Sequence, residues 1–293
     1  MGYFARSWEL GKTSWRVLRK DKELLWLPVL GGVAALIIAG IVFLIIALVS
    51  YDPADGLYDM EVGGGSVLLI ILGVIVAAIA VYFFQGALVH GARERLTGGD
   101  PTVASAIRGA WGRIGAIAPW AIVALVVGFI INTIQAAARD RAGIFGAIMG
   151  SLLDLAWRAL TFLVMPIIIA EGAGAFAAIG RSKNLLRRTW GENLVAQAGL
   201  SIVGFILMLP GLLIAIFLGS GPLGVFGVIV GGLLMIFGAV VASALSAVYQ
   251  TALYEYATTG ESPAEFAEVN LGQSFGHRSD RGSRWGQPGQ YRT

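Results

Sequence analysis

Two charged residues inside a long apolar segment are the first candidates for chemistry in this sequence. Asp154 and Arg158 lie four residues apart in the run SLLDLAWRALTFLVMPIIIAEG. This spacing brings both side chains to one face of a helix, with the acid on the N-terminal side, which is the better orientation for an ion pair. One such residue alone at the centre of a bilayer costs about 2.5–3.5 kcal/mol to insert. The pair therefore either neutralises itself and fixes helix packing, or forms a polar element of a translocation or proton path.

Three uncharged polar residues extend this candidate intramembrane site. Thr161 follows in the same segment, and Asn132 and Gln135 lie near the far end of the preceding apolar segment. Asn132 and Gln135 join the site only if the two segments pack side by side, which the sequence leaves open. The candidate intramembrane polar site thus consists of Asp154, Arg158, Thr161, Asn132 and Gln135.

The usual sequence signatures of enzymes are missing. The chain has no cysteine and only two histidines, His90 and His277, so thiol catalysis and thiolate metal sites are excluded. The run GGGSVLL lacks the Gly-Lys-Ser/Thr ending of a phosphate-binding loop. We therefore expect no catalytic residue, no metal site and no cofactor, and we predict that the protein is not an enzyme.

Composition indicates that these residues are positioned by membrane-spanning helices. The chain is 57% hydrophobic and 13% charged, whereas soluble domains carry about 25% charged residues. A helix needs about 20 apolar residues to cross a bilayer. Six segments meet this requirement: 27–50, 66–89, 114–137, 143–170, 194–218 and 222–257. The last is longer than a bilayer requires, so we expect it to tilt or to run on into water.

The distribution of Lys and Arg predicts the orientation. Nearly all of them fall on one side of the six spans; the exceptions are Arg139 and Arg141 on the other side and Arg158 within a span. The loop at 52–61 after the first span is acidic. By the positive-inside rule, both termini are cytoplasmic, and we expect a multi-pass protein of the plasma membrane.

A basic, Trp-containing amphipathic segment precedes every odd-numbered span, near 4–22, 102–112 and 175–190. Such segments lie at the membrane interface and contact anionic headgroups. An alignment of the first segment with the second, without a gap, places Ser14 opposite Ser105 and Pro28 opposite Pro119. This match favours three repeated units. Alternatively, basic segments arise wherever a membrane protein needs anchoring. The candidate headgroup contacts are Lys12, Arg16, Arg19, Lys20, Arg108, Arg113, Lys183, Arg187 and Arg188.

The predicted fold is therefore all-α. It is a polytopic membrane bundle of six transmembrane helices, arranged as three units of an interfacial helix plus a helical hairpin over residues 1–259. Residues 260–293 are polar and rich in Gly, Ser, Gln and Arg, and are expected to form a disordered cytoplasmic tail. Prolines 28, 119, 166 and 210 lie in spans and can kink them.

Small residues at four-residue spacing indicate close helix packing. Gly227 and Gly231, then Gly238 and Ala242, form such steps in the last span, and Gly31 begins another in the first span. These faces let helix backbones approach one another. They join helices either within one chain or between two copies.

Two stretches resemble a known family. These are AWRALTFLVMPIIIAEGAGAFAAIGRSKNLLRRTWGENL and FARSWELGKTSWRVLRKDKELLWLPVL. They are similar to a prokaryotic family of six-span integral membrane proteins classed as a domain of unknown function, over roughly residues 4–267. More distantly, the chain resembles the membrane portion of glycerophosphodiester phosphodiesterases and Yip-like proteins. The residues that carry the resemblance are Ser7, Trp8, Trp157, Thr161, Pro166, Glu171, Ser182, Trp190 and Gly191. Because no catalytic domain accompanies them, the resemblance implies an architecture and no activity.

Two functions remain open from the sequence. The first is a membrane scaffold that organises anionic lipid or a partner protein, possible partners including a second copy of the chain, with no role for nucleic acid. The second is a transporter or channel whose path runs beside Asp154 and Arg158.

Overall fold

The structure is a computed structural model that describes residues 3–49, 64–189, 194–219 and 224–266. Side chains are described at 12–49, 64–141, 143–186, 206–218 and 224–266. The acidic loop at 52–61, Trp190, Gly191 and the chain beyond 266 lie outside the described residues. All regular secondary structure in the described ranges is helical.

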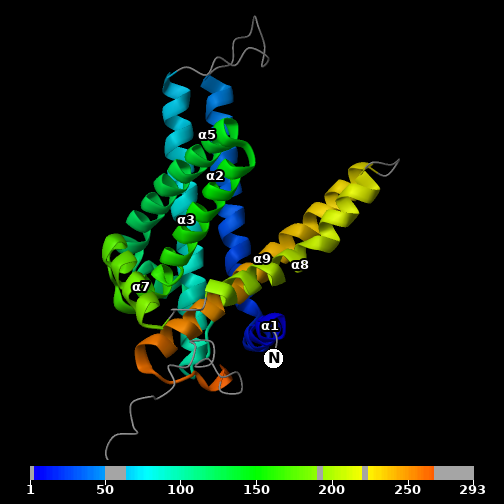
Figure 1. Cartoon of the computed structure of the whole chain (residues 1–293). Coiled ribbons are helices and arrows are strands. Elements are labelled where there is room, and N and C mark those ends of the chain that lie inside the picture. Colours follow the sequence, from blue (N-terminus) through cyan, green and yellow to red (C-terminus); the bar gives the residue numbers. More distant parts are fainter. Residues whose placement is uncertain (1–2, 50–63, 190–193, 220–223, 267–293) are drawn as a thin grey trace, which may run out of the picture.

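The helices follow one another in an order that repeats three times (Figure 1). A helix at the base of the molecule leads each time into two long helical arms. The first unit is α1 (Tyr3–Lys20), η1 (Lys22–Leu25), α2 (Trp26–Val49) and α3 (Gly64–Leu96). The second is α4 (Val103–Trp111), α5 (Ile114–Thr161) and α6 (Val164–Glu171). The third is α7 (Ala175–Thr189), α8 (Leu194–Gly219) and α9 (Gly224–Thr259), followed by η2 (Ala264–Phe266).

A single glycine turns α5 back on itself. Gly143 has φ 52° and ψ −127°, a conformation that is accessible to glycine and strained for other residues. The chain before it, Ile114–Arg141, and the chain after it, 143–161, therefore run as two antiparallel arms. Near the turn they touch closely, because a Cβ added to Gly150 would lie 2.7 Å from Cγ of Gln135.

The fourth predicted span is not one continuous helix. α5 ends at Thr161 and α6 begins at Val164. Pro166 explains the break, because a proline ring clashes with the carbonyl four residues earlier, here that of Phe162. Pro166 and Pro28 are each the third residue of their helix, where no intrahelical N–H is required. These two prolines therefore begin helices rather than kink them.

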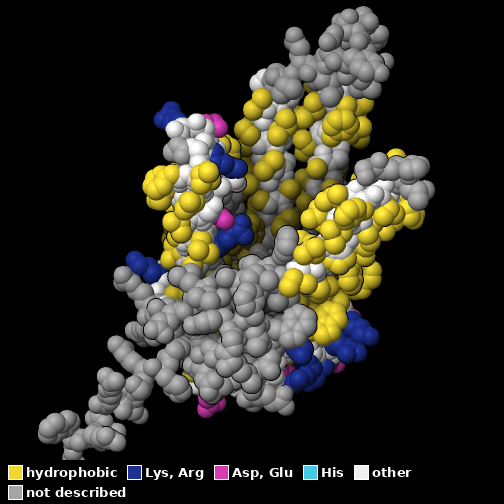
Figure 2. Space-filling view, turned by 45° about the vertical axis from the view of Figure 1, so that its right-hand side comes forward, with side chains coloured by type: hydrophobic (Ala, Val, Ile, Leu, Met, Phe, Trp, Pro, Cys, Tyr) yellow, Lys and Arg dark blue, Asp and Glu magenta, His cyan; other side chains and the backbone are white. Residues whose placement is uncertain are grey.

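Five helical stretches are long and apolar enough to cross a membrane: Lys22–Val49, Gly64–Leu96, Ile114–Arg141, Gly143–Glu171 and Gly224–Thr259. A shorter apolar stretch, Ile206–Leu218, belongs to α8. The arms expose large apolar side chains along most of their length, among them Leu36 of α2 and Phe237 of α9. Figure 2 shows this apolar surface on the arms; Lys and Arg side chains lie at the lower right of the molecule and also along the arm at the upper left. These features are typical of a membrane protein.

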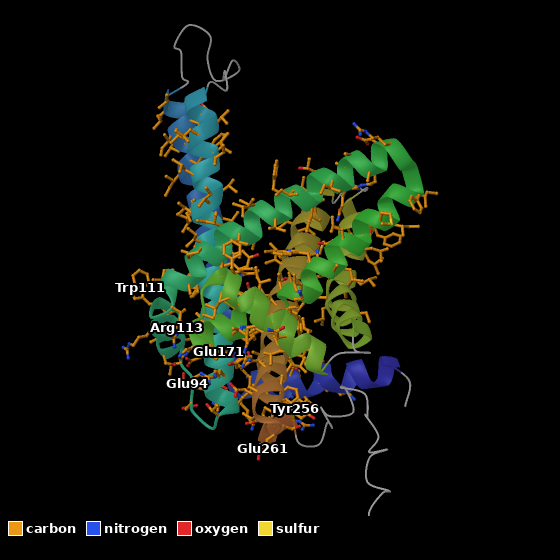
Figure 3. The ribbon with its side chains drawn as sticks, turned by 60° about the vertical axis from the view of Figure 1, so that its left-hand side comes forward. Glu94, Trp111, Arg113, Glu171, Tyr256 and Glu261 are labelled. Carbon is orange, nitrogen blue, oxygen red and sulfur yellow. The ribbon has the colours of Figure 1, made fainter. Side chains whose placement is uncertain are left out.

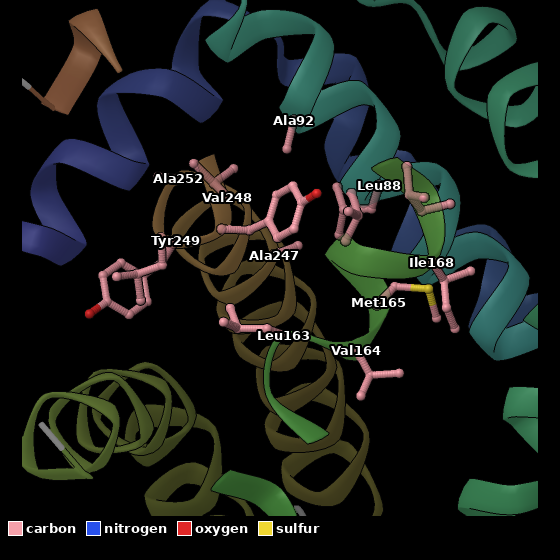
Figure 4. Packing of buried hydrophobic residues seen from close by; sticks show 14 of the residues in the cluster. Leu88, Ala92, Leu163, Val164, Met165, Ile168, Ala247, Val248, Tyr249 and Ala252 are labelled. Carbon is pink, nitrogen blue, oxygen red and sulfur yellow. The ribbon is translucent and has the colours of Figure 1, made fainter. Parts of the chain in front are cut away.

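The three units converge on one apolar core at the base. The core joins the last turns of α3, the whole of α6 and the C-terminal half of α9. Figure 4 shows Leu88 of α3, Met165 of α6 and Val248 of α9 in this cluster. The sequence predicts that the last span tilts or runs on into water. Its end does not enter water, because Leu253 and Tyr254 are buried, and α9 lies at an angle to α2 and α3 (Figure 1). The turns of α9 that exceed the length of a bilayer crossing form part of the core at the base.

The first residues of the predicted tail, up to Phe266, pack on the base. Ala264–Phe266 form a helical turn, η2, and the Phe266 side chain is fully buried. One aromatic residue thus anchors the chain on the base, where the polar composition of the segment had predicted disorder from residue 260 onward.

Ion pairs and a hydrogen bond surround the core, one pair within the first unit and the others between units. Arg95 of α3 donates to the buried carboxylate of Asp21. Arg93 Nε of α3 donates to Glu255 Oε1 of α9 at 2.7 Å. Glu171 Oε1 of α6 accepts from Tyr254 Oη at 3.0 Å and from Arg181 Nε of α7 at 3.2 Å. Glu171 therefore links α6 to both α7 and α9.

The amphipathic helices α1, α4 and α7 pack against this core. Their small and aliphatic side chains are buried: Val17, Leu18, Ala106, Ala110, Ala178 and Leu185. Trp111 and Phe176 remain 67% and 77% exposed. The sequence pattern suggested that the apolar stripe lies on lipid; instead, much of it covers the protein core, and single large aromatic residues are left at the surface.

Close helix contacts at glycines lie within the chain. A Cβ on Gly231 of α9 would lie 2.6 Å from the Gly211 carbonyl oxygen of α8, and one on Gly238 would lie 2.7 Å from that of Leu207. In the first hairpin, a Cβ on Gly31 would lie 3.1 Å from Phe84 Cβ. These small residues therefore join neighbouring helices of one chain, one of the two alternatives left open by the sequence.

Candidate functional site

One polar cavity lies between α3 and the two arms of α5. It has a volume of about 390 Å³. All five residues of the predicted intramembrane polar site line it: Asn132, Gln135, Asp154, Arg158 and Thr161. The remaining wall is made by Tyr82, Ala124, Gly128, Ile131 and Trp157. The third and fourth predicted spans do pack side by side, as the site required.

Asp154 and Arg158 form the ion pair that their spacing predicts. Arg158 Nε donates to Asp154 Oδ2 at 2.7 Å. The Arg158 side chain is 71% exposed and that of Asp154 is 34% exposed. In Figure 2, acidic and basic side chains interrupt the apolar surface partway along one arm. The pair thus holds itself together within one helix and faces the open side of the cavity.

The uncharged polar residues take different parts. Gln135 Nε2 donates to the Gly150 carbonyl oxygen at 3.0 Å, so its amide bridges the two arms. Thr161 Oγ1 donates to the Trp157 carbonyl oxygen at 2.8 Å within its own helix. Asn132 is exposed at the cavity. Hydrogen-bonding groups therefore remain on the first arm of α5 opposite the ion pair.

Two aromatic side chains, Tyr82 and Trp157, line the cavity. Trp157 stacks on Trp120 with ring centroids 6.2 Å apart and an interplanar angle of 27°. Tyr82 of α3 meets Trp120 edge-on at 6.1 Å. Sequence reasoning did not include Tyr82, because nothing in the sequence places α3 beside α5. Its only signal was a phenol near the centre of an otherwise apolar segment.

The lining of this cavity offers several kinds of ligand-binding group. It combines one guanidinium, one carboxylate, two amides and two aromatic rings. Among the described residues, no three His, Asp or Glu side chains converge as a metal site needs. Exposed apolar residues, including Val126, Phe129 and Leu155, surround the cavity on both arms of α5.

A second group of predicted residues lies at the base. The side chains described there are exposed at Lys12, Arg16, Arg19, Lys20, Arg108, Arg113 and Lys183. We call these seven residues the basic rim. Arg187 and Arg188 are in α7, but their side chains lie outside the described residues. Figure 3 shows Trp111 and Arg113 at the outer edge of the base.

Arg113 is positioned by a glycine. Gly172 ends α6 in the left-handed conformation with φ 68°, and a Cβ there would overlap the Arg113 guanidinium. The same residue therefore allows the turn that ends α6 and gives the arginine space to lie against it.

Comparison with known proteins adds one match. No curated protein and no solved structure matches the chain significantly. The model of a family of unknown function, DUF6159, matches residues 64–264. This range runs from the start of α3 to the first residue of η2 and includes the polar cavity and most of the core. The chain therefore belongs to the DUF6159 family of unknown function.

Proposed function

We propose that this protein is a non-enzymatic plasma-membrane protein that binds anionic lipid through the basic rim and organises lipid or a partner protein there. In this proposal the chain crosses the bilayer six times, and both termini and the base are cytoplasmic. The distant similarity to the membrane portion of glycerophosphodiester phosphodiesterases and to Yip-like proteins remains a prediction.

The observation that carries the proposal is the outward display of the basic rim. The helices α1, α4 and α7 bury their small and aliphatic side chains in the core, so their cationic side chains are held at the surface. Trp111 and Phe176 are exposed beside them. Aromatic and cationic residues together favour the headgroup region of a bilayer.

The sixth crossing is assigned to α8. The helix has 26 residues, which makes it about 39 Å long, more than the roughly 30 Å of a bilayer core. Gly211 and Gly231 bring it against α9, which is itself long and apolar enough to span. With α8 included, each of the three units contributes one hairpin.

Lipid binding by the rim is tested by neutralising two charges. In Arg19→Gln with Lys20→Gln, we expect binding of phosphatidylglycerol by the full chain to weaken about tenfold to thirtyfold, because each cation contributes roughly 1 kcal/mol near an anionic surface. The measurement is titration of phosphatidylglycerol into the delipidated protein, followed by native mass spectrometry.

The matched control removes two cations at the opposite end of the molecule, Arg139→Gln with Arg141→Gln. These residues lie at the turn of α5, away from the rim. The proposal expects a small change in this control. Equal weakening in both double variants would show that total charge, and not the basic rim, determines lipid binding.

A second candidate function, a transport path, is favoured by the polar cavity. Its lining contains all five predicted polar residues. The test compares Asp154→Asn, Arg158→Gln and the exchange of the two residues in cells. If all three variants fold and complement a deletion strain fully, the path is excluded.

A further inference from the structure

We infer that the polar cavity binds the headgroup of a zwitterionic phospholipid that enters it sideways from the bilayer. The ligand chemistry is a phosphate joined to an ammonium group, as in phosphatidylethanolamine. The cavity is separate from the basic rim, and the inference depends neither on lipid binding there nor on a transport path.

The ion pair leaves groups for both charges of such a ligand. Arg158 uses Nε for Asp154, and its side chain is 71% exposed, so the terminal N–H groups are accessible to a ligand. A guanidinium binds phosphate oxygens through paired N–H donors. Asp154 uses Oδ2 for Arg158, which leaves Oδ1 as an acceptor for an ammonium hydrogen.

The aromatic wall favours a cation next to the carboxylate. Trp157 lies one turn from Asp154 and lines the cavity together with Tyr82. The faces of Trp and Tyr attract ammonium groups within about 6 Å of the ring centroid. Because Trp157 is stacked on the buried Trp120, its ring is held in place before any ligand arrives.

The balance of charge selects a neutral ligand. One carboxylate and one guanidinium line the cavity, and its other lining residues are uncharged. A ligand with only a negative charge would be repelled by the Asp154 carboxylate. A ligand with only a positive charge would be repelled by the Arg158 guanidinium. In surroundings of low dielectric constant, both arrangements cost more than they do in water. A zwitterion satisfies the two side chains at once.

The surroundings of the cavity favour a ligand with apolar tails. Asp154 lies 11 residues beyond the turn at Gly143, about 16 Å along its helix. Both arms expose apolar side chains, among them Leu155 at 45% on the arm of Asp154 and Phe129 at 72% on the other arm. The volume of about 390 Å³ lies within the range of roughly 300–1,000 Å³ found for small-molecule sites. A lipid can place its headgroup in the cavity while its acyl chains cover these apolar side chains.

A cavity-filling variant tests the inference without altering a charge. Gly128 lines the cavity, and a Cβ added there meets no atom within 4 Å. In Gly128→Leu, we expect the binding of phosphatidylethanolamine to the full chain to fall at least about tenfold. The control is Gly40→Leu on the exposed surface of α2, where a Cβ also meets no atom within 4 Å and binding should not change.

Removal of the phosphate ligand gives a second, independent variant. Arg158→Gln should weaken phosphatidylethanolamine binding by about tenfold or more, as expected for loss of a charge-assisted hydrogen bond. Both variants are titrated with phosphatidylethanolamine, phosphatidylglycerol and soluble phosphoethanolamine, with native mass spectrometry as the readout. Gly128→Leu retains the ion pair, so the test stands even if Arg158→Gln does not fold.

The crossed design separates this inference from the proposed function. The inference predicts that cavity variants lose phosphatidylethanolamine and keep phosphatidylglycerol, and that the Arg19→Gln, Lys20→Gln variant does the opposite. Unchanged phosphatidylethanolamine binding in Gly128→Leu would overturn the inference. So would displacement of the lipid by equimolar soluble phosphoethanolamine, because the site would then bind a soluble ligand. Preference of the cavity for phosphatidylglycerol would overturn the zwitterionic assignment.

Discussion

The contact between α8 and α9 predicts a large difference between two adjacent glycines. A Cβ on Gly231 would lie 2.6 Å from both the Ala215 nitrogen and the Gly211 carbonyl oxygen, whereas one on Gly232 meets no atom within 4 Å. Replacement by alanine raises helix propensity by about 1 kcal/mol at either position. Only at Gly231 must α8 move outward, and such overpacking costs about 1–3 kcal/mol. Gly231→Ala should therefore be less stable than Gly232→Ala by about that amount.

Thermal unfolding of the two purified variants in the same detergent, followed by tryptophan fluorescence, measures this difference. At about 2–4 °C per kcal/mol for a chain of this size, the Tm of Gly231→Ala should be about 2–12 °C below that of Gly232→Ala. Because both variants add one methyl group to the same helix, propensity cancels. Equal Tm values would refute the packing of α8 on α9, and the assignment of the sixth crossing with it.

The base offers three further tests in the same unfolding assay. Arg95→Gln leaves the buried carboxylate of Asp21 without its partner and should cost about 3–5 kcal/mol; a Tm unchanged from wild type would mean that this ion pair does not hold the base. Ser182→Ala removes a 2.7 Å hydrogen bond to the Leu160 carbonyl at a fully buried position and should cost about 1–2 kcal/mol, so a gain in Tm would argue against that contact. Gly172→Ala places a side chain at φ 68° and should cost about 1–2 kcal/mol; a stabilised variant would exclude the left-handed end of α6.

Much of the polar cavity follows from the hairpin that contains it. Asn132 lies 11 residues before Gly143 and Asp154 lies 11 residues after it, so a turn at this glycine brings both to the same level. The ion pair itself needs only helical spacing. These parts depend on local geometry, which a sequence pattern contains.

Other parts depend on contacts between distant segments. The contact of Tyr82 with Trp120 joins α3 to α5, and these segments are distant in the sequence. The amphipathic pattern of α1 and α4 likewise does not reveal whether protein or lipid covers their apolar side. In the structure, Leu18 and Ala110 are buried by protein. Phe266 likewise lies in a polar segment, and its burial depends on a core formed by three separate units.

The side of the membrane on which each hairpin ends tests the central claim most directly. The chain has no cysteine, so single cysteines can be introduced at four positions. Asp140 lies at the turn end of the first arm of α5, Ser220 follows α8 in the sequence, and Ala104 and Glu261 lie near the base. With a membrane-impermeant maleimide on intact cells, we expect labelling at positions 140 and 220, and labelling at 104 and 261 only after permeabilisation. Labelling of positions 220 and 261 from the same side would contradict six crossings and the placement of the basic rim in the cytoplasm.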